Sequence, residues 1–332
     1  MLVTSRDSAW QGIADPVSVD LLSAEDAVEL LVRRTGDPDQ QAAARLAEAL
    51  GRLPLALEQA AAYAANQRLS LASYLALFKE RREELLALGR PLAYQGTVDA
   101  TFTLAREQLQ TANPAAVQLL ELCALLAPDE LPLPLLLGDS KLLPEPLAAA
   151  VADPLRRGGV AGALYKEGLL SQDGDDTARM HRLVQDVTLA RLPEADRRNR
   201  TTDAVRLVNG LFPREAWEPD QWPQCAHLLT HSQAVVGHAR TLQLTSSILA
   251  GLLHRIGQYM GSRGLDRQLV REVLEQALAM RRRLYEGDHP DVAASLNSLA
   301  RDLRRLGEFE QARELDEQAE AMRQRISRTS KQ

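Results

Sequence analysis

The sequence predicts a mainly α-helical protein with one small β-hairpin and a helical repeat near its C-terminal end. Three observations support this class. Apolar residues recur at helical spacing between capping and breaking residues through most of the chain. Strand-like stretches are few and short. A segment of helical pattern also occurs twice near the C-terminal end, which is typical of repeat proteins.

The composition limits the kinds of protein that this chain can be. Its 332 residues, 45% hydrophobic and 25% charged, suit a soluble protein of two or three domains. It has neither a long apolar run nor a signal-peptide pattern, so we expect no membrane span and a cytoplasmic location. Cys123 and Cys225 are too few for a disulfide framework and are expected to be reduced thiols. The net charge of −6 argues against general affinity for nucleic acid.

Residues 1–20 contain a short extended apolar piece, LVT at 2–4, followed by the polar turn SRDS. A strand needs neighbouring strands to be stable, and strand patterns are scarce in the rest of the chain. We therefore expect residues 1–20 to be the remnant of an α/β domain whose other strands are absent.

Residues 21–96 are predicted to form a bundle of four helices joined by short connections. Capping and breaking residues mark the boundaries of these helices. Ser23 is predicted to cap the first helix, and Asp37 to cap the second, with Pro38 as its first helical residue. The third helix is predicted to start at Pro54, and Ser70 to cap the fourth. Gly51 is predicted to end the second helix and Gly89 the fourth.

Residues 97–192 have a different layout. Helices are expected at 98–110, 114–127 and 154–166, although Gly158 and Gly159 cost the last one about 1 kcal/mol each relative to alanine. Two short extended runs follow, GLLSQ and TARMH, joined by the turn DGDD, and then a helix, LVQDVTLARL. Helices, a hairpin and a further helix in this order predict a winged-helix module.

Residues 193–241 are interpreted as a helical linker, and residues 242–332 as a helical solenoid of tetratricopeptide type. LEQALAM at 274–280 aligns with DEQAEAM at 316–322, and each unit is a pair of amphipathic helices. Small residues are expected where the helices cross, at Ala277, Ala300, Ala312 and Ala319. Leu274 and Leu278 of the earlier unit become Asp316 and Glu320 in the later one, which predicts a polar cap on the last helix.

The order of these parts resembles the NB-ARC group of STAND signalling ATPases, which includes plant disease-resistance proteins and bacterial regulators with tetratricopeptide tails. The final repeats resemble those of kinesin light chain. The likeness covers nearly the whole chain, and three short motifs carry it.

The first motif is LVTSRD at 2–7, which is similar to the family's sensor strand. The resemblance implies that Arg6 is directed at the terminal phosphate of a nucleotide, a role that suits a planar and permanently charged guanidinium.

The second motif is GRLPLAL at 51–57, which resembles the family's GLPLAL box with Arg52 inserted. Gly51 permits a turn with positive φ, and Pro54 then begins a helix. The resemblance implies that Pro54 packs on the adenine. Glycine and proline also occur commonly in ordinary turns between two helices. The motif therefore indicates this family only in combination with the winged-helix pattern that follows it.

The third motif is MHR at 180–182, which resembles the family's MHD motif with Arg182 in place of the aspartate. The resemblance implies that His181 reaches the β-phosphate of ADP and holds the protein in a closed state. An imidazole suits this role because one ring nitrogen can donate to phosphate while a neighbour holds the other. The alternative is a structural histidine at a junction between strand and helix.

The sequence contains neither a GxxxxGK[ST] phosphate-binding loop nor an apolar strand that ends in paired aspartates. Arg6, Pro54 and His181 would therefore form only half of a nucleotide site, and ADP or ATP would bind only with a P-loop half from elsewhere. We expect no catalytic residues and no ATP hydrolysis by this chain alone. The P-loop half would lie upstream of a chain that begins within a domain.

Other motifs are weaker indicators of function. His227 and His231 lie one helical turn apart, a spacing used in metal sites, but they lack an adjacent glutamate and a third ligand, so no metal site is predicted. Paired carboxylates in the loops, such as Asp129 with Glu130, lack the partners of a hydrolase site.

Three functions remain open at this stage. The first is the regulatory, oligomerisation and partner-binding part of a nucleotide-dependent switch, which engages an upstream P-loop domain or a second copy and binds a protein through residues 242–332. The second is a tetratricopeptide scaffold without nucleotide function. The third is a winged-helix regulator that binds DNA, but residues 98–192 hold 8 Arg and Lys against 13 Asp and Glu. A basic face is needed to contact DNA phosphates, and residues 154–166 offer only Arg156, Arg157 and Lys166.

Overall fold

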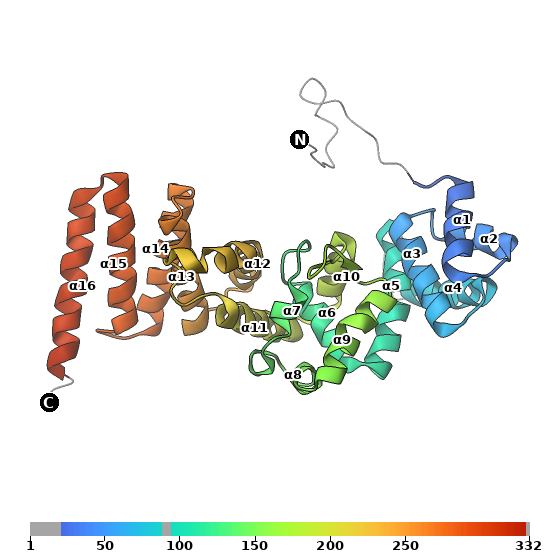
Figure 1. Cartoon of the computed structure of the whole chain (residues 1–332), viewed down its shortest axis with the longest axis horizontal. Coiled ribbons are helices and arrows are strands. Elements are labelled where there is room, and N and C mark those ends of the chain that lie inside the picture. Colours follow the sequence, from blue (N-terminus) through green and yellow to red (C-terminus); the bar gives the residue numbers. More distant parts are fainter. Residues whose placement is uncertain (1–20, 88–93, 330–332) are drawn as a thin grey trace, which may run out of the picture. The chain divides into compact units, whose positions relative to one another are not determined.

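The computed structural model describes residues 21–87 and 94–329, and most of these residues are in α-helices (Figure 1). The mainly α fold class is thereby confirmed, and the two-stranded sheet is the single sheet of the described part. The chain divides into two compact units, Met1–Ala105 and Arg106–Gln332, each of which is considered by itself. The strand predicted at residues 2–4 lies outside the described residues.

The first unit is built from short helices that pack through leucine and alanine. Leu31, Leu46, Leu57 and Phe78 are fully buried in its core, and the rings of Tyr63 and Tyr74 lie 5.6 Å apart. The helices are α1 (Ala24–Thr35), α2 (Gln40–Ala49), α3 (Pro54–Gln67), α4 (Leu71–Ala87) and the first part of α5 (Tyr94–Ala112).

The predicted cap of α1 is confirmed, because the Ser23 hydroxyl accepts from the Asp26 N–H at 3.0 Å. The predicted start of α2 was wrong by two residues. The Asp39 carboxylate caps this helix by accepting from the Ala42 N–H at 2.9 Å, so Pro38 precedes the cap. The Asp37 carboxylate accepts instead from the Leu71 N–H at 2.8 Å, which ties the start of α4 to the turn before α2. The predicted end of α4 at Gly89 lies outside the described residues.

The second unit begins with short helices around a minimal hairpin. Strand β1 (Ser171–Gln172) pairs antiparallel with β2 (Ala178–Arg179), and Leu131 forms an isolated bridge with Ala178. The predicted runs were longer than these two-residue strands. The helices are α6 (Pro114–Cys123), α7 (Leu133–Leu136), α8 (Leu147–Ala152), α9 (Pro154–Lys166), α10 (Arg182–Arg191) and α11 (Glu194–Leu211).

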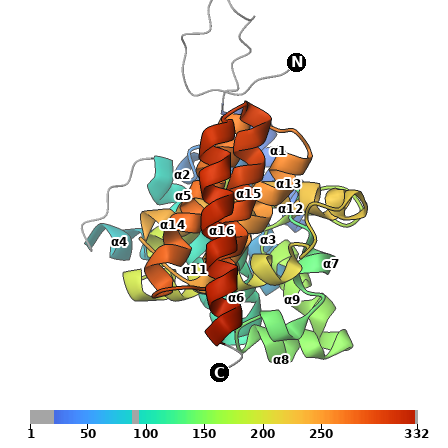
Figure 2. The same ribbon diagram turned by 90° about the vertical axis from the view of Figure 1, so that its left-hand side faces the viewer.

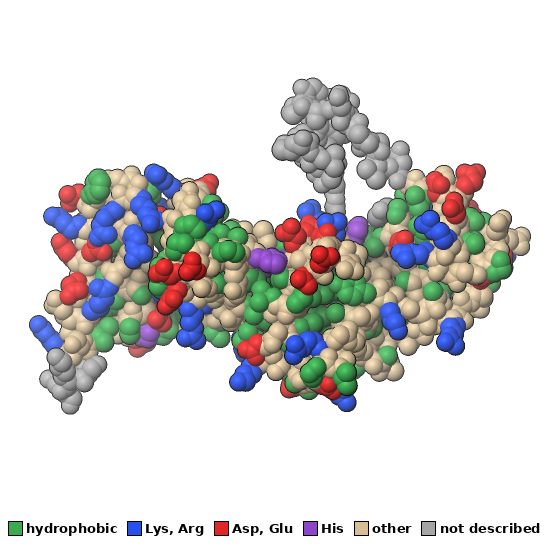
Figure 3. All heavy atoms as spheres, viewed as in Figure 1, with side chains coloured by type: hydrophobic (Ala, Val, Ile, Leu, Met, Phe, Trp, Pro, Cys, Tyr) green, Lys and Arg blue, Asp and Glu red, His purple; other side chains and the backbone are tan. Residues whose placement is uncertain are grey.

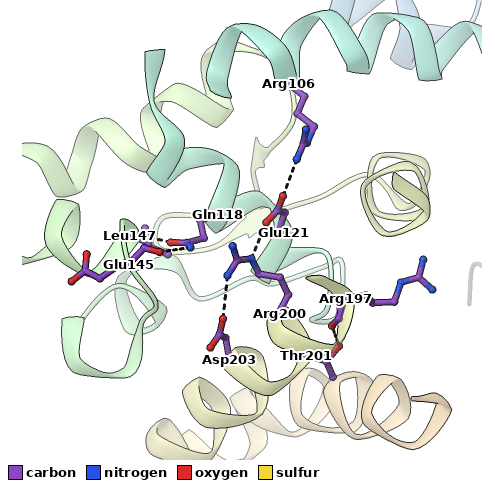
Figure 4. Close-up of polar contacts among 9 residues, drawn as sticks. All are labelled: Arg106, Gln118, Glu121, Glu145, Leu147, Arg197, Arg200, Thr201 and Asp203. Atoms are coloured by element: carbon purple, nitrogen blue, oxygen red, sulfur yellow. Dashed lines mark hydrogen bonds and ion pairs between the residues drawn. The ribbon is translucent and has the colours of Figure 1, made fainter. Parts of the chain in front are cut away.

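A buried carboxylate connects α5, α6 and α11 in this unit. Glu121 lies between two arginines, with Arg106 Nη2 at 3.0 Å from one carboxylate oxygen and Arg200 Nε at 2.8 Å from the other (Figure 4). Arg200 also pairs with Asp203 at 3.1 Å. Only 8% of the Glu121 side chain is exposed, so the ion pairs offset the loss of its hydration. We call Glu121, Arg106 and Arg200 the Glu121 brace.

A neighbouring polar contact on α6 positions the start of α8. The Gln118 side chain accepts from the Leu147 N–H at 2.9 Å and donates to the Glu145 carbonyl at 2.6 Å (Figure 4). A buried amide thus satisfies the Leu147 N–H at the start of α8 and the Glu145 carbonyl just before that helix. Gln118 and Glu121 lie one helical turn apart, so the two polar contacts share one side of an otherwise apolar helix.

The end of the second unit is a stack of antiparallel helices, in which α15 and α16 lie side by side (Figures 1 and 2). The alanines predicted at the helix crossings, Ala277, Ala300, Ala312 and Ala319, are all fully buried. The helices of the stack are α12 (Trp222–Thr241), α13 (Ser247–Ser262), α14 (Arg267–Leu284), α15 (Pro290–Leu306) and α16 (Phe309–Thr329).

The two repeats differ at two matched positions as the sequence predicts. Leu274 and Leu278 on α14 are buried, whereas the matching residues on α16, Asp316 and Glu320, are not. Asp316 forms an ion pair with Arg304, and Glu320 is exposed beside Arg323. These two positions of α16 are therefore polar and lie outside the core. No helix of the described residues has the length and apolar character needed to cross a membrane.

Replacing Glu121 tests the importance of the brace. Glu121→Ala would leave the guanidinium groups of Arg106 and Arg200 without their shared partner, and we expect the free energy of unfolding to fall by about 3 kcal/mol. Urea denaturation provides the measurement. Glu317→Ala is the control, because it removes an exposed carboxylate on α16 and should change stability by less than about 0.5 kcal/mol. Equal decreases in the free energy of unfolding for the two substitutions would show that the Glu121 brace does not stabilise the fold.

The crossing of α13 and α14 depends on Gly257. A methyl group at this position would lie 2.5 Å from Leu274 Cδ2, whereas one at Gly237 on α12 would meet no atom within 4 Å. We expect Gly257→Ala to destabilise the protein by about 1–3 kcal/mol through overpacking. Gly237→Ala should stabilise it by up to about 1 kcal/mol, because alanine favours a helix. Melting temperatures of both variants check this contrast, and a stable Gly257→Ala variant would contradict it.

Stability should also fall in mild acid, in part because of His254. This histidine is buried on α13, and burial lowers its pKa to about 4. In the unfolded state this histidine takes up a proton below about pH 6.5, whereas in the folded state it does so only near pH 4. The free energy of unfolding therefore decreases between these two pH values, and at pH 5 it should be about 2 kcal/mol lower than at pH 7. Unfolding free energies at pH 7 and pH 5 test this. His254→Gln should lose less stability than the wild type, and identical losses would be the contrary result.

Candidate functional site

The three residues predicted to contact a nucleotide lie in different parts of the chain. Arg6 is outside the described residues, so its predicted role stays a prediction. Pro54 belongs to the first unit and His181 to the second. Each of these two is therefore described in its own surroundings.

Pro54 is the first residue of α3, as predicted, and its side chain is exposed. The turn before it needs two consecutive residues with positive φ, Gly51 at +64° and Arg52 at +52°. The glycine was predicted, but the left-handed conformation of Arg52 was not. The Arg52 N–H donates to the Ala47 carbonyl at 2.9 Å, which holds this conformation and presents Pro54 at the surface.

His181 is the capping residue of α10. Its Nδ1 accepts from the Leu183 N–H at 3.1 Å, so the proton of the neutral ring belongs on Nε2. Partial burial of the ring lowers the pKa of this histidine, which favours the neutral ring, although the residue remains exposed to solvent. No hydrogen bond of Nε2 occurs among the described residues. The ring therefore has one nitrogen held by its own helix and a second that can donate to a ligand.

The backbone on both sides of His181 is anchored to the rest of the unit. Met180 is buried, and its N–H donates to the Pro128 carbonyl at 2.8 Å. On the helical side, the Gln185 side chain donates to the Leu126 carbonyl at 2.7 Å. Arg182, the residue that replaces the family's aspartate, is exposed. The histidine is thus presented at the surface from a fixed backbone.

Two of the basic residues on α9, the helix considered for DNA binding, already have partners near its start. Arg156 pairs with Asp153 at 3.4 Å, and Arg157 Nε donates to the Val151 carbonyl at 3.1 Å. Arg156 thus contacts the capping residue of its own helix, and Arg157 contacts the preceding helix α8. Leu155, which is 92% exposed, lies beside them, and it cannot neutralise phosphates.

His231, one half of the pair of histidines noted in the sequence, has a structural position. It is fully buried, its Nε2 lies 3.2 Å from the Glu130 carbonyl, and burial lowers its pKa. His227 on the same helix is exposed. In the described part of the chain, no group of three or more His, Cys, Asp or Glu residues is arranged to hold a metal.

A pocket of about 420 Å³ lies beside the C-terminal end of α13. The loop after α13, the start of α14 and the second half of α15 form its walls. Asp302 lines this pocket although it is 5% exposed. The sequence interpretation missed this residue. The signal was present, because Asp302 occupies a turn of α15 where Leu299 and Leu303 mark the buried face.

Comparisons with known proteins agree with the repeat prediction. Residues 240–325 match the tetratricopeptide repeat family, and residues 107–197 match a family described as Domain of unknown function (DUF7779). Over 316 residues, 90% of the chain, the sequence is 26% identical to a protein of Hyaloscypha variabilis described as a nucleotide-binding leucine-rich repeat (NLR)-like protein. The chain spans 30% of the length of that relative. It thus joins tetratricopeptide repeats to a helical region that is similar to part of an NLR-like protein.

Proposed function

We propose that this chain is the regulatory and partner-binding part of a nucleotide-controlled signalling switch of the NB-ARC type. The observation that carries the proposal is the geometry of His181, whose Nδ1 is held by the Leu183 N–H while Nε2 is left to donate. The similarity to an NLR-like protein supports the same class of function. The chain itself lacks a phosphate-binding loop, so the nucleotide would be held mainly by another domain.

In this proposal, the β-phosphate of ADP accepts a hydrogen bond from His181 Nε2. A neutral imidazole with its proton on Nε2 is a suitable donor, and the start of α10 adds the partial positive charge of a helix N-terminus. The resemblance further assigns the adenine contact to Pro54 and the contact with the terminal phosphate to Arg6. ADP binds the closed state more tightly than the open one and thereby shifts the equilibrium between them.

The repeats supply the partner-binding surface. Stacked helical pairs form extended surfaces that suit protein ligands, and residues 240–325 match a family of such repeats. Basic side chains are crowded over α14, α15 and α16 (Figure 3), interspersed with carboxylates. A partner bound here would change the balance between closed and open states only if it bound one of them more tightly.

A release assay tests the role of His181. The chain is combined with a P-loop domain that holds a fluorescent ADP analogue, and release of the analogue is timed. We expect His181→Ala to speed release by at least about tenfold, because a hydrogen bond to a charged group is lost. His227→Ala replaces another exposed histidine and should leave release unchanged.

His181→Asp separates phosphate binding from helix capping. Aspartate is a good capping residue but cannot donate to phosphate, so this variant should fold normally and still release ADP fast. Slow release from His181→Asp would contradict the proposed contact.

Calorimetry on the chain alone should detect no micromolar binding of ADP or ATP, since only half of the site is present. Micromolar binding to the chain alone would refute the half-site.

A further inference from the structure

The pocket beside the end of α13 contains a buried acid without an ion pair or hydrogen bond among the described residues. Asp302 is 5% exposed, and its Oδ2 is fully buried and unpartnered. Burial raises the pKa of its carboxyl group, and nearby arginines, with Arg305 the strongest, only partly counteract this. A buried carboxylate without a partner is costly, so the residue needs an explanation.

No ion pair or hydrogen bond of Asp302 holds the repeat together among the described residues. Its surroundings include Val270 and Leu274, both buried apolar residues, so a leucine at 302 would extend the same apolar face. A smaller hollow of about 20 Å³, which shares Asp302 with the pocket, has room for a single water molecule. Such a water would satisfy one oxygen but would supply no opposite charge.

Four arginines line this pocket or the smaller hollow that adjoins it, and none of them forms an ion pair within the described part of the chain. Arg263 lies over the Trp222 ring at 4.9 Å, Arg267 donates to the Arg305 carbonyl at 3.2 Å, and Arg305 donates to the Gly261 carbonyl. Arg301 is exposed on α15. We call Arg263, Arg267, Arg301 and Arg305 the arginine rim.

Two other arginines of the stack do have carboxylate partners. Arg271 pairs with Glu275 at 2.8 Å and with Glu308 at 2.9 Å, and Arg325 pairs with Asp288 at 2.6 Å. In and beside this pocket, by contrast, arginines without a carboxylate partner surround a buried carboxylate that also has no ion pair among the described residues. An occupant with the opposite arrangement, a cation between two acids, would complement both.

We propose that this pocket binds a peptide segment of a partner protein in which one lysine or arginine is flanked by acidic residues. The cationic side chain enters the pocket and pairs with Asp302, and the flanking carboxylates pair with the arginine rim. Without the acidic flanks, the rim would repel the incoming cation. This inference rests on the proposed role of the repeats as a partner-binding surface, and it names the chemistry of the partner.

Two labelled pentapeptides test the pocket, EEKEE with a central lysine and EEQEE with a central glutamine. Fluorescence anisotropy with the whole chain should show EEKEE binding at least about tenfold more tightly, because only the lysine can neutralise Asp302. Asp302→Asn should abolish this preference. Arg301→Gln should weaken both peptides, whereas Arg283→Gln, which removes an exposed arginine outside the pocket, should weaken neither.

Melting temperatures separate binding from folding. Asp302→Asn and Asp302→Leu should melt at or above the temperature of the wild type, because a buried charge is removed. A marked drop in both variants would assign Asp302 to the fold and overturn the proposal. Equal binding of the two peptides, or no binding of either, would also overturn it. His181-dependent ADP release would survive such a result, so failure of the pocket is distinguishable from failure of the switch.

Discussion

Leucine and alanine fill most of the core of this protein, because aromatic residues make up only 4% of the chain. Small side chains fill space only if helices approach closely, and this requirement decides which residues can stand at the crossings. Gly257 against Leu274 is the clearest case, since a single methyl group there has no room. Close packing of this kind also leaves little freedom for a buried polar group, which must either find a partner or face a pocket.

Buried charges in the second unit fall into two kinds. Glu121 has two arginine partners, and Arg281 donates to the Asp291 carbonyl and the Ser295 hydroxyl, each at 2.7 Å. These groups are satisfied within the protein and belong to its architecture. Asp302 has no such partner, and the pocket beside it is lined by arginines that also lack carboxylate partners. This contrast separates a charge that serves the fold from one that is available to a ligand.

The capping role of His181 is compatible with the binding role proposed for it. The two nitrogens of an imidazole are distinct, and capping α10 uses only Nδ1. Capping also determines which nitrogen carries the proton, so the contact with Leu183 prepares the other nitrogen as a donor. The two interpretations of this histidine, structural and functional, are therefore compatible.

Local patterns in the sequence were sufficient to predict the helical class, the position of the hairpin and the repeat register, because apolar periodicity and capping residues are local properties. Pro54 at the start of α3 and the buried Met180 before His181 follow from the same local rules. The pairing of polar residues became visible only in the packed structure. Asp37 binds a backbone group 34 residues away, Glu121 binds Arg200 79 residues away, and Asp302 remains unpaired. Such pairings depend on how distant helices pack, and no local pattern of residues encodes them.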